Sequence, residues 1–179
     1  MNITLKTKFY ISCLLRILIT IFVLFFTNIN LFIKIIIIML SDSLDSTIPR
    51  ALFDKWICTK SSKCNNLYYQ RLDKIIDSIC YIILLYYIIS INIFSNDINN
   101  FLIFLLIFRL IGVILFLSNN NRKFLFYFPN FFLEISLAYS LINYYDLYNI
   151  ENIIIIIVII YKVIQEYFMH FLKWDKKNK

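Results

Sequence analysis

Helix-breaking residues are scarce in this sequence. Its 179 residues include one Gly and two Pro. Secondary transporters often contain Gly- or Pro-interrupted helices in corresponding halves of the chain, and no such pair is present here. The scarcity argues against a transporter of that kind, and no internal repeat supports one.

Zinc ligands are scarce too. The chain has one His and four Cys. Cys58 and Cys64 lack the additional Cys or His partners that a structural zinc site needs. The sequence therefore argues against a zinc-binding module.

Hydrophobic residues are abundant instead. They make up 61% of the chain, and the mean hydropathy is +0.75, whereas soluble domains are typically about 45–50% apolar. Apolar stretches near or above the roughly 18–20 residues that cross a hydrocarbon core recur along the whole sequence. We therefore expect one all-α transmembrane domain over residues 1–179, with nothing left for a soluble domain or linker. Its predicted helices span about residues 9–27, 31–52, 67–94, 101–117, 124–144 and 150–172.

The number of crossings depends on the first apolar region, from Phe9 to Leu40. As one helix, its ~32 residues would be about 48 Å long. A bilayer core is only roughly 30 Å thick, so we expect this region to cross twice.

Charge supports that count, because Lys and Arg gather in cytoplasmic loops. With six crossings, 14 of the 18 Lys and Arg residues lie on one side, in the N-terminus, the second and fourth connections and the C-terminal tail. The connections on the other side contain none. The sequence therefore predicts a multi-pass bundle of about six helices with both termini cytoplasmic.

Four aspartates flank the second connection. Asp42 and Asp45 are three residues apart, and Asp73 and Asp77 are four apart, so each pair shares one face of its helix. An Asp costs roughly 2.5–3.5 kcal/mol at mid-membrane, and four together repel strongly unless cations neutralise them. Such an all-oxygen site suits Mg²⁺ or Mn²⁺, and two ions about 3.5–4 Å apart can clamp a pyrophosphate.

The aspartates lie in two motifs. The first is Asp42-Ser-Leu-Asp45-Ser46-Thr-Ile-Pro49-Arg50, and the second is Tyr69-Gln-Arg-Leu-Asp73-Lys-Ile-Ile-Asp77. Together they resemble the signature of the CDP-alcohol phosphotransferases, D-x-x-D-G-x-x-A-R followed by G-x-x-x-D-x-x-x-D, at the cytoplasmic ends of the second and third of six helices. The four Asp and the Arg match, while Ser46, Pro49 and Tyr69 replace the pattern's Gly, Ala and Gly.

The resemblance implies an enzyme of phospholipid biosynthesis. It would transfer a phosphatidyl or phosphoalcohol group from CDP-diacylglycerol or a CDP-alcohol to an alcohol and release CMP, with its active site facing the cytoplasm. Asp77 would be the general base that deprotonates the alcohol. The implied ligands of two Mg²⁺ or Mn²⁺ ions are Asp42, Asp45, Asp73 and Asp77. The residues implied at the nucleotide and its phosphates are Arg50, Ser46 and Tyr69.

Alternatives stay open. The chain is an inactive relative or a structural membrane component if its Asp and Arg side chains only cap helix ends and pair with each other. Arg109 lies within an apolar segment, where it either reaches a phosphate or acceptor alcohol or pairs with Glu134. We expect membrane lipid as a partner and no nucleic acid. Whether the chain forms a homodimer is left open by the sequence.

Overall fold

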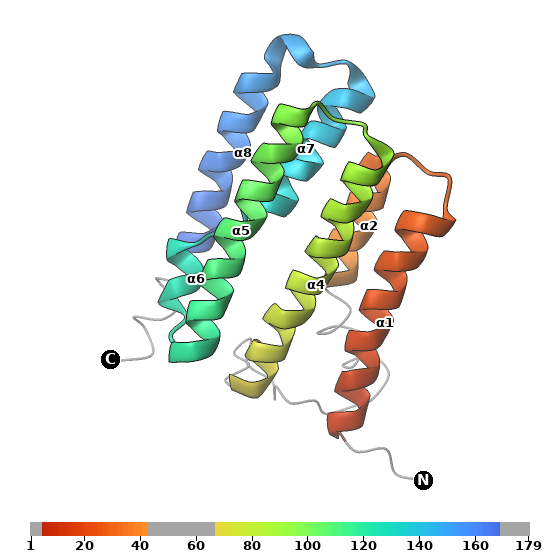
Figure 1. The fold of residues 1–179 in the computed structure, drawn as a ribbon. Coiled ribbons are helices and arrows are strands. Elements are labelled where there is room, and N and C mark those ends of the chain that lie inside the picture. The colour runs from red at the N-terminus through yellow and green to blue at the C-terminus, as the bar shows by residue number, and fades with distance from the viewer. Residues whose placement is uncertain (1–4, 43–66, 169–179) are drawn as a thin grey trace.

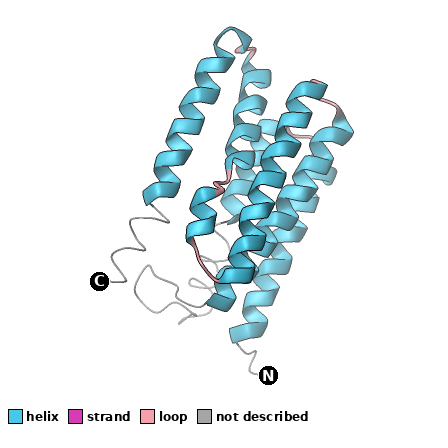
Figure 2. Ribbon diagram, turned by 60° about the vertical axis from the view of Figure 1, so that its left-hand side comes forward, coloured by secondary structure: helices cyan, strands magenta, loops and turns pink. Residues whose placement is uncertain are grey.

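The computed structural model describes residues 5–42 and 67–168, which form helices joined by short turns (Figures 1 and 2). No strand occurs among these residues, so the all-α prediction is confirmed for them. The helices are α1 (Leu5–Phe26), α2 (Leu31–Asp42), α4 (Leu67–Ile91), α5 (Asn96–Asn119), α6 (Lys123–Tyr127), α7 (Phe131–Tyr145), the 3₁₀ turn η1 (Tyr148–Ile150) and α8 (Glu151–Glu166).

Among the described residues, four helical segments are long and apolar enough to cross a membrane. They are Gln70–Ile91, Asn96–Asn119, Lys123–Tyr145 and Tyr148–Glu166. The apolar helices Tyr10–Phe26 and Leu31–Ser41 are shorter. Length and composition therefore fit an integral membrane protein.

The long helices lie side by side and run alternately up and down (Figure 1). α4 packs between α1 and α5, and α7 packs against α2, α5 and α8. The shared core contains fully buried side chains from α2, α4, α5 and α7, among them Ile35, Leu84, Leu102 and Phe132. α8 stands at the edge of the bundle, and only 6% of its apolar 18-residue stretch is buried inside the protein. Such a helix is suited to contact with lipid.

The fourth expected helix begins earlier than its apolar run indicates. It was expected over residues 101–117, but α5 spans Asn96–Asn119. Ser95 acts as the N-cap, since its hydroxyl accepts a hydrogen bond from Ile98 N. The polar residues ahead of Phe101 thus form a capped first turn and not a loop.

The fifth expected helix, over residues 124–144, matches the apolar segment Lys123–Tyr145, but the structure interrupts it. α6 ends at Tyr127 and α7 begins at Phe131. Pro129 lies between them, and it disfavours helical geometry in the residue before it. Phe128 accordingly adopts φ −121° and ψ 70°.

Arg109 satisfies the backbone at this interruption. Its Nη1 donates to Leu125 O at 3.2 Å and to Phe128 O at 2.8 Å. Irregular backbone at membrane depth persists only where protein groups satisfy its polar atoms. The buried guanidinium on α5 therefore stabilises the break between α6 and α7.

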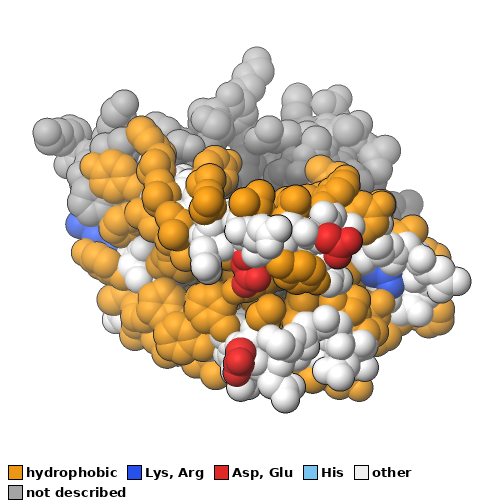
Figure 3. All heavy atoms as spheres, turned by 90° about the horizontal axis from the view of Figure 1, so that it is seen from above, with side chains coloured by type: hydrophobic (Ala, Val, Ile, Leu, Met, Phe, Trp, Pro, Cys, Tyr) orange, Lys and Arg blue, Asp and Glu red, His pale blue; other side chains and the backbone are white. Residues whose placement is uncertain are grey.

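One end of the bundle carries the turns between α1 and α2, α4 and α5, and α7 and α8 (Figure 1). Seen from this end, a few acidic side chains stand among hydrophobic ones (Figure 3). Asp97 lies in the first turn of α5, Asp146 caps α7, and Glu151 begins α8. The opposite end carries the start of α4 and the turn into α6 (Figure 1).

Gly112, the single glycine, gives a test of the α5–α6 packing. A Cβ at this position would lie 2.3 Å from Phe128 Cβ, closer than real carbon atoms approach. We expect Gly112→Ala to destabilise the protein by about 1–3 kcal/mol, because overpacking forces the backbone to shift. The measurement is thermal unfolding in detergent, where the double variant Gly112→Ala/Phe128→Gly should recover part of the loss, because it removes the Phe128 Cβ that the new methyl group would meet. Equal stability of Gly112→Ala and the wild type would contradict this packing.

Candidate functional site

Two of the predicted aspartates lie on the face of α4 that meets α1. Arg16 of α1 donates from Nη2 to Asp77 Oδ1 at 2.6 Å, and its Nη1 lies 3.8 Å from Asp73 Oδ1. Lys74 Nζ lies 2.6 Å from Asp77 Oδ2 and 2.7 Å from Asp73 Oδ2. The four side chains form one ion-pair cluster that joins the two helices.

Burial makes this cluster an interior feature of the bundle. The side chains of Arg16 and Asp77 are 2% and 6% exposed, while those of Lys74 and Asp73 are 19% and 16% exposed. Two cations and two carboxylates balance in charge, and that balance removes most of the cost of placing an isolated charge at membrane depth. The Lys74–Asp73 side of the cluster is the one more open to the surroundings.

The end of α2 lies at the same level as this cluster. Lys34 Nζ donates to Tyr87 OH at 2.7 Å, so these two residues of α2 and α4 are level. α2 runs eight residues further to Asp42, and the same eight residues back along α4 lead to Ile79. At about 1.5 Å per residue, the Asp42 backbone is within roughly one turn of the level of Asp77. Whether both motifs reach one depth stays a prediction, because the first motif beyond Asp42 lies outside the described residues.

Other predicted site residues lie partly or wholly outside the described part of the chain. Asp45, Ser46 and Arg50 fall in residues 43–66, which the structure does not describe. Asp42 and Tyr69 belong to described helices, but only through their backbones. Whether four carboxylates converge therefore stays a prediction.

Within residues 5–42 and 67–168, no group of three or more His, Cys, Asp or Glu side chains is arranged to hold a metal ion. Asp73 and Asp77 supply two carboxylates, of the hard oxygen type that Mg²⁺ and Mn²⁺ prefer. Both oxygens of Asp77 already accept hydrogen bonds from cationic side chains. A metal ion at this position would have to displace Lys74, the more exposed of the two cations.

Sequence reasoning missed the role of Arg16. It was one of several charges within apolar segments, and its distance of 61 positions from Asp77 gives no local signal. The sequence did indicate that Arg16 has a partner, because an Arg buried in an apolar segment needs an anionic or carbonyl group. Which partner it has depends on how α1 and α4 pack.

Arg109 and Glu134 do not form the ion pair that was one of the two expectations for Arg109. Arg109 binds main-chain carbonyls at the α6–α7 break. Glu134 instead accepts from Lys162 Nζ at 2.5 Å, and Lys162 also lies 3.2 Å from Glu166 Oε1. This second buried cluster joins α7 to α8. The other expectation, that Arg109 contacts a phosphate, stays a prediction.

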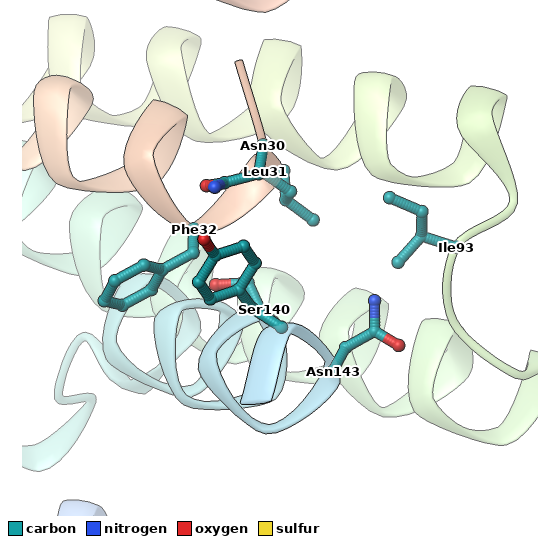
Figure 4. Close-up of a pocket in the computed structure, with 7 residues that line it drawn as sticks. Asn30, Leu31, Phe32, Ile93, Ser140 and Asn143 are labelled. Atoms are coloured by element: carbon teal, nitrogen blue, oxygen red, sulfur yellow. The ribbon is translucent and has the colours of Figure 1, made fainter. Parts of the chain in front are cut away.

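A pocket of about 230 Å³ lies near the opposite end of the bundle (Figure 4). Its polar lining comes from Asn30, Ser140, Asn143 and Tyr144. None of the predicted site residues contributes to it. It is therefore separate from the aspartate cluster.

Comparison of the chain with protein-family models, curated proteins and solved structures finds no match. Function is therefore inferred from the two Asp motifs and from the ion-pair cluster between α1 and α4.

The Arg16–Asp77 pair predicts that loss of Arg16 alone destabilises the protein more than loss of both charges together. Arg16→Met leaves a buried carboxylate with Lys74 as its remaining cation. Since breaking a buried ion pair costs about 3–5 kcal/mol, we expect a loss near the lower limit of that range. Arg16→Met/Asp77→Asn should recover much of it, because the uncompensated charge is gone. Unfolding in detergent measures both, and a double variant no more stable than Arg16→Met would contradict the pairing.

Proposed function

We propose that the chain is a multi-pass membrane enzyme that transfers a phosphoalcohol or phosphatidyl group from a CDP-linked donor to an alcohol, with release of CMP. The observation that carries this proposal is the shared face of Asp73 and Asp77 on α4, at the level where α2 ends in Asp42. The six-crossing topology, with both termini and the site on the cytoplasmic side, belongs to the same proposal.

The proposed roles follow the motif. Asp42, Asp45, Asp73 and Asp77 would hold two Mg²⁺ or Mn²⁺ ions, which supply charge neutralisation at the donor's diphosphate. Asp77 would accept the proton of the attacking hydroxyl. The fit is partial in the described residues, because two carboxylates are present there and both are paired with cations.

Arg16 would hold Asp77 in place from α1. Its Nη2 bonds only one carboxylate oxygen of Asp77, and the other oxygen faces Lys74. Movement of Lys74 would therefore free one oxygen without releasing Asp77 from α1. Arg50 would contact a phosphate, and Ser46 and Tyr69 would line the nucleotide site.

One observation favours the second candidate, a non-catalytic membrane protein. Arg16 and Lys74 together balance Asp73 and Asp77, so the cluster needs no metal ion for electrical neutrality. In that case the aspartates join α1 to α4 and do no chemistry. The two candidates differ in whether Lys74 can be displaced by a divalent cation.

The test is CMP release by the purified full chain with Mg²⁺ or Mn²⁺. Donors are CDP-diacylglycerol and CDP-alcohols, and acceptors include inositol, serine, glycerol phosphate and diacylglycerol. Removal of a general base typically costs about 10²–10⁴-fold in rate, so Asp77→Asn should nearly abolish turnover. Asp97→Asn, at the other end of the bundle, is the matched control and should leave turnover unchanged.

Tyr69→Gly restores the small residue of the family pattern. If Tyr69 restricts the nucleotide site, this variant should bind CMP more tightly than the wild type. Absence of CMP release across all donors and acceptors, together with absence of metal-dependent CMP binding in both proteins, would favour the non-catalytic candidate.

A further inference from the structure

The turn between α5 and α6 presents an arginine whose guanidinium makes no contact of hydrogen-bonding or ion-pair type with the described residues. α5 ends at Asn119, Asn120 takes the left-handed conformation as its C-cap, and Arg122 precedes α6. The Arg122 side chain makes no capping hydrogen bond. Within the described part of the chain, its guanidinium has neither a hydrogen bond nor an ion pair, although it is partly buried.

This position is electrostatically unusual for a surface arginine. Burial lowers the pKa of the Arg122 guanidinium, while the charges of Asp73 and Glu166 act in the opposite direction. The group stays charged at physiological pH because an arginine pKa lies so high. A guanidinium carries five N–H donors. No nitrogen of Arg122 is among the fully buried unpaired atoms of the described residues, so its donors remain accessible to a ligand.

The nearby carboxylates are already occupied by other cations. Asp73 lies 2.7 Å from Lys74, and Glu166 lies 3.2 Å from Lys162. Asp73 and Glu166 therefore pair directly with other cations and not with Arg122. Arg122 consequently contributes positive charge that no described residue at this end of the bundle cancels by contact.

A second guanidinium lies at the end of α5. Arg71 Nη2 donates to Leu117 O at 2.5 Å, in the last turn of α5. Its Nε is buried and has no hydrogen-bond partner in the described residues. Arg71 therefore adds positive charge near the end of α5, while its buried Nε is not accessible to a ligand.

We propose that Arg122, supported by the charge of Arg71, anchors a phosphate-binding site at the α5–α6 turn. The planar fork of an arginine matches two oxygens of a phosphate group, and such charge-assisted pairs are among the strongest hydrogen bonds in proteins. The phosphate belongs either to an anionic lipid headgroup or to a soluble phosphate ester. The site depends on the α5–α6 turn and not on the aspartates, so it stands even if the proposed transfer reaction is wrong.

The experiment uses the full chain in dodecyl maltoside and two probes. Native mass spectrometry measures retention of phosphatidylglycerol, with diacylglycerol as the lipid that lacks phosphate. Isothermal titration calorimetry measures binding of inorganic pyrophosphate. The variants are Arg122→Gln, Arg122→Lys and the matched control Lys123→Gln, which removes one positive charge from the same turn.

We expect one bound equivalent of one probe in the wild type. Loss of a charge-assisted hydrogen bond should weaken its binding on the order of tenfold or more in Arg122→Gln. Arg122→Lys should be intermediate, and Lys123→Gln should stay within about twofold, because the site requires a fork and not only charge. Retention of the lipid alone identifies a headgroup site, and binding of pyrophosphate alone identifies a site for a soluble ester.

Two results would overturn the proposal. The first is equal weakening by Arg122→Gln and Lys123→Gln, which would show attraction by net charge alone. The second is absence of binding of both probes to a wild-type protein whose circular dichroism shows intact helices. If Arg122→Gln fails to fold, the comparison of Arg122→Lys with the wild type decides between fork and charge.

Discussion

Charge buried inside an apolar bundle is the constraint that organises this structure. Four cations are fully buried among the described residues, and each has an internal partner. Arg16 pairs with Asp77 and Lys162 with Glu134, whereas Lys34 donates to Leu24 O and Arg109 donates to carbonyls at the α6–α7 break. Because lipid offers no hydrogen bonds, a cation with no such partner would cost several kcal/mol.

These partners also specify how the helices are paired. Apolar side chains gain little from helix association when the surrounding lipid is equally apolar. The isoleucine-rich surfaces of α2 and α8 therefore carry little information about neighbours. Arg16 joins α1 to α4, Lys162 joins α7 to α8, and Lys34 links α2 to both α1 and α4. The polar contacts supply the specificity that the apolar surfaces lack.

The sequence predicted the helices well because apolar length is a local property. It did not predict the break before α7, although Pro129 is a local signal that a reading of hydropathy alone passes over. It also did not predict that Arg16 and Lys74 occupy the carboxylates of Asp73 and Asp77, since that depends on which faces of α1 and α4 meet. The spacing of Asp73 and Asp77 predicted that they share one face of α4, and the packing of α1 against α4 decided their partners.

We propose that the end of the bundle with the starts of α1 and α4 and the turn into α6 faces the cytoplasm. Topology mapping with single reporter tags in intact cells tests it most directly. Tags on the cytoplasmic side are expected at Met1, Ser61, Asn120 and Lys179. Tags at Asn96 and Asn149 are expected on the opposite side. A tag at Ser61 on the side opposite to the tag at Met1 would contradict the claim.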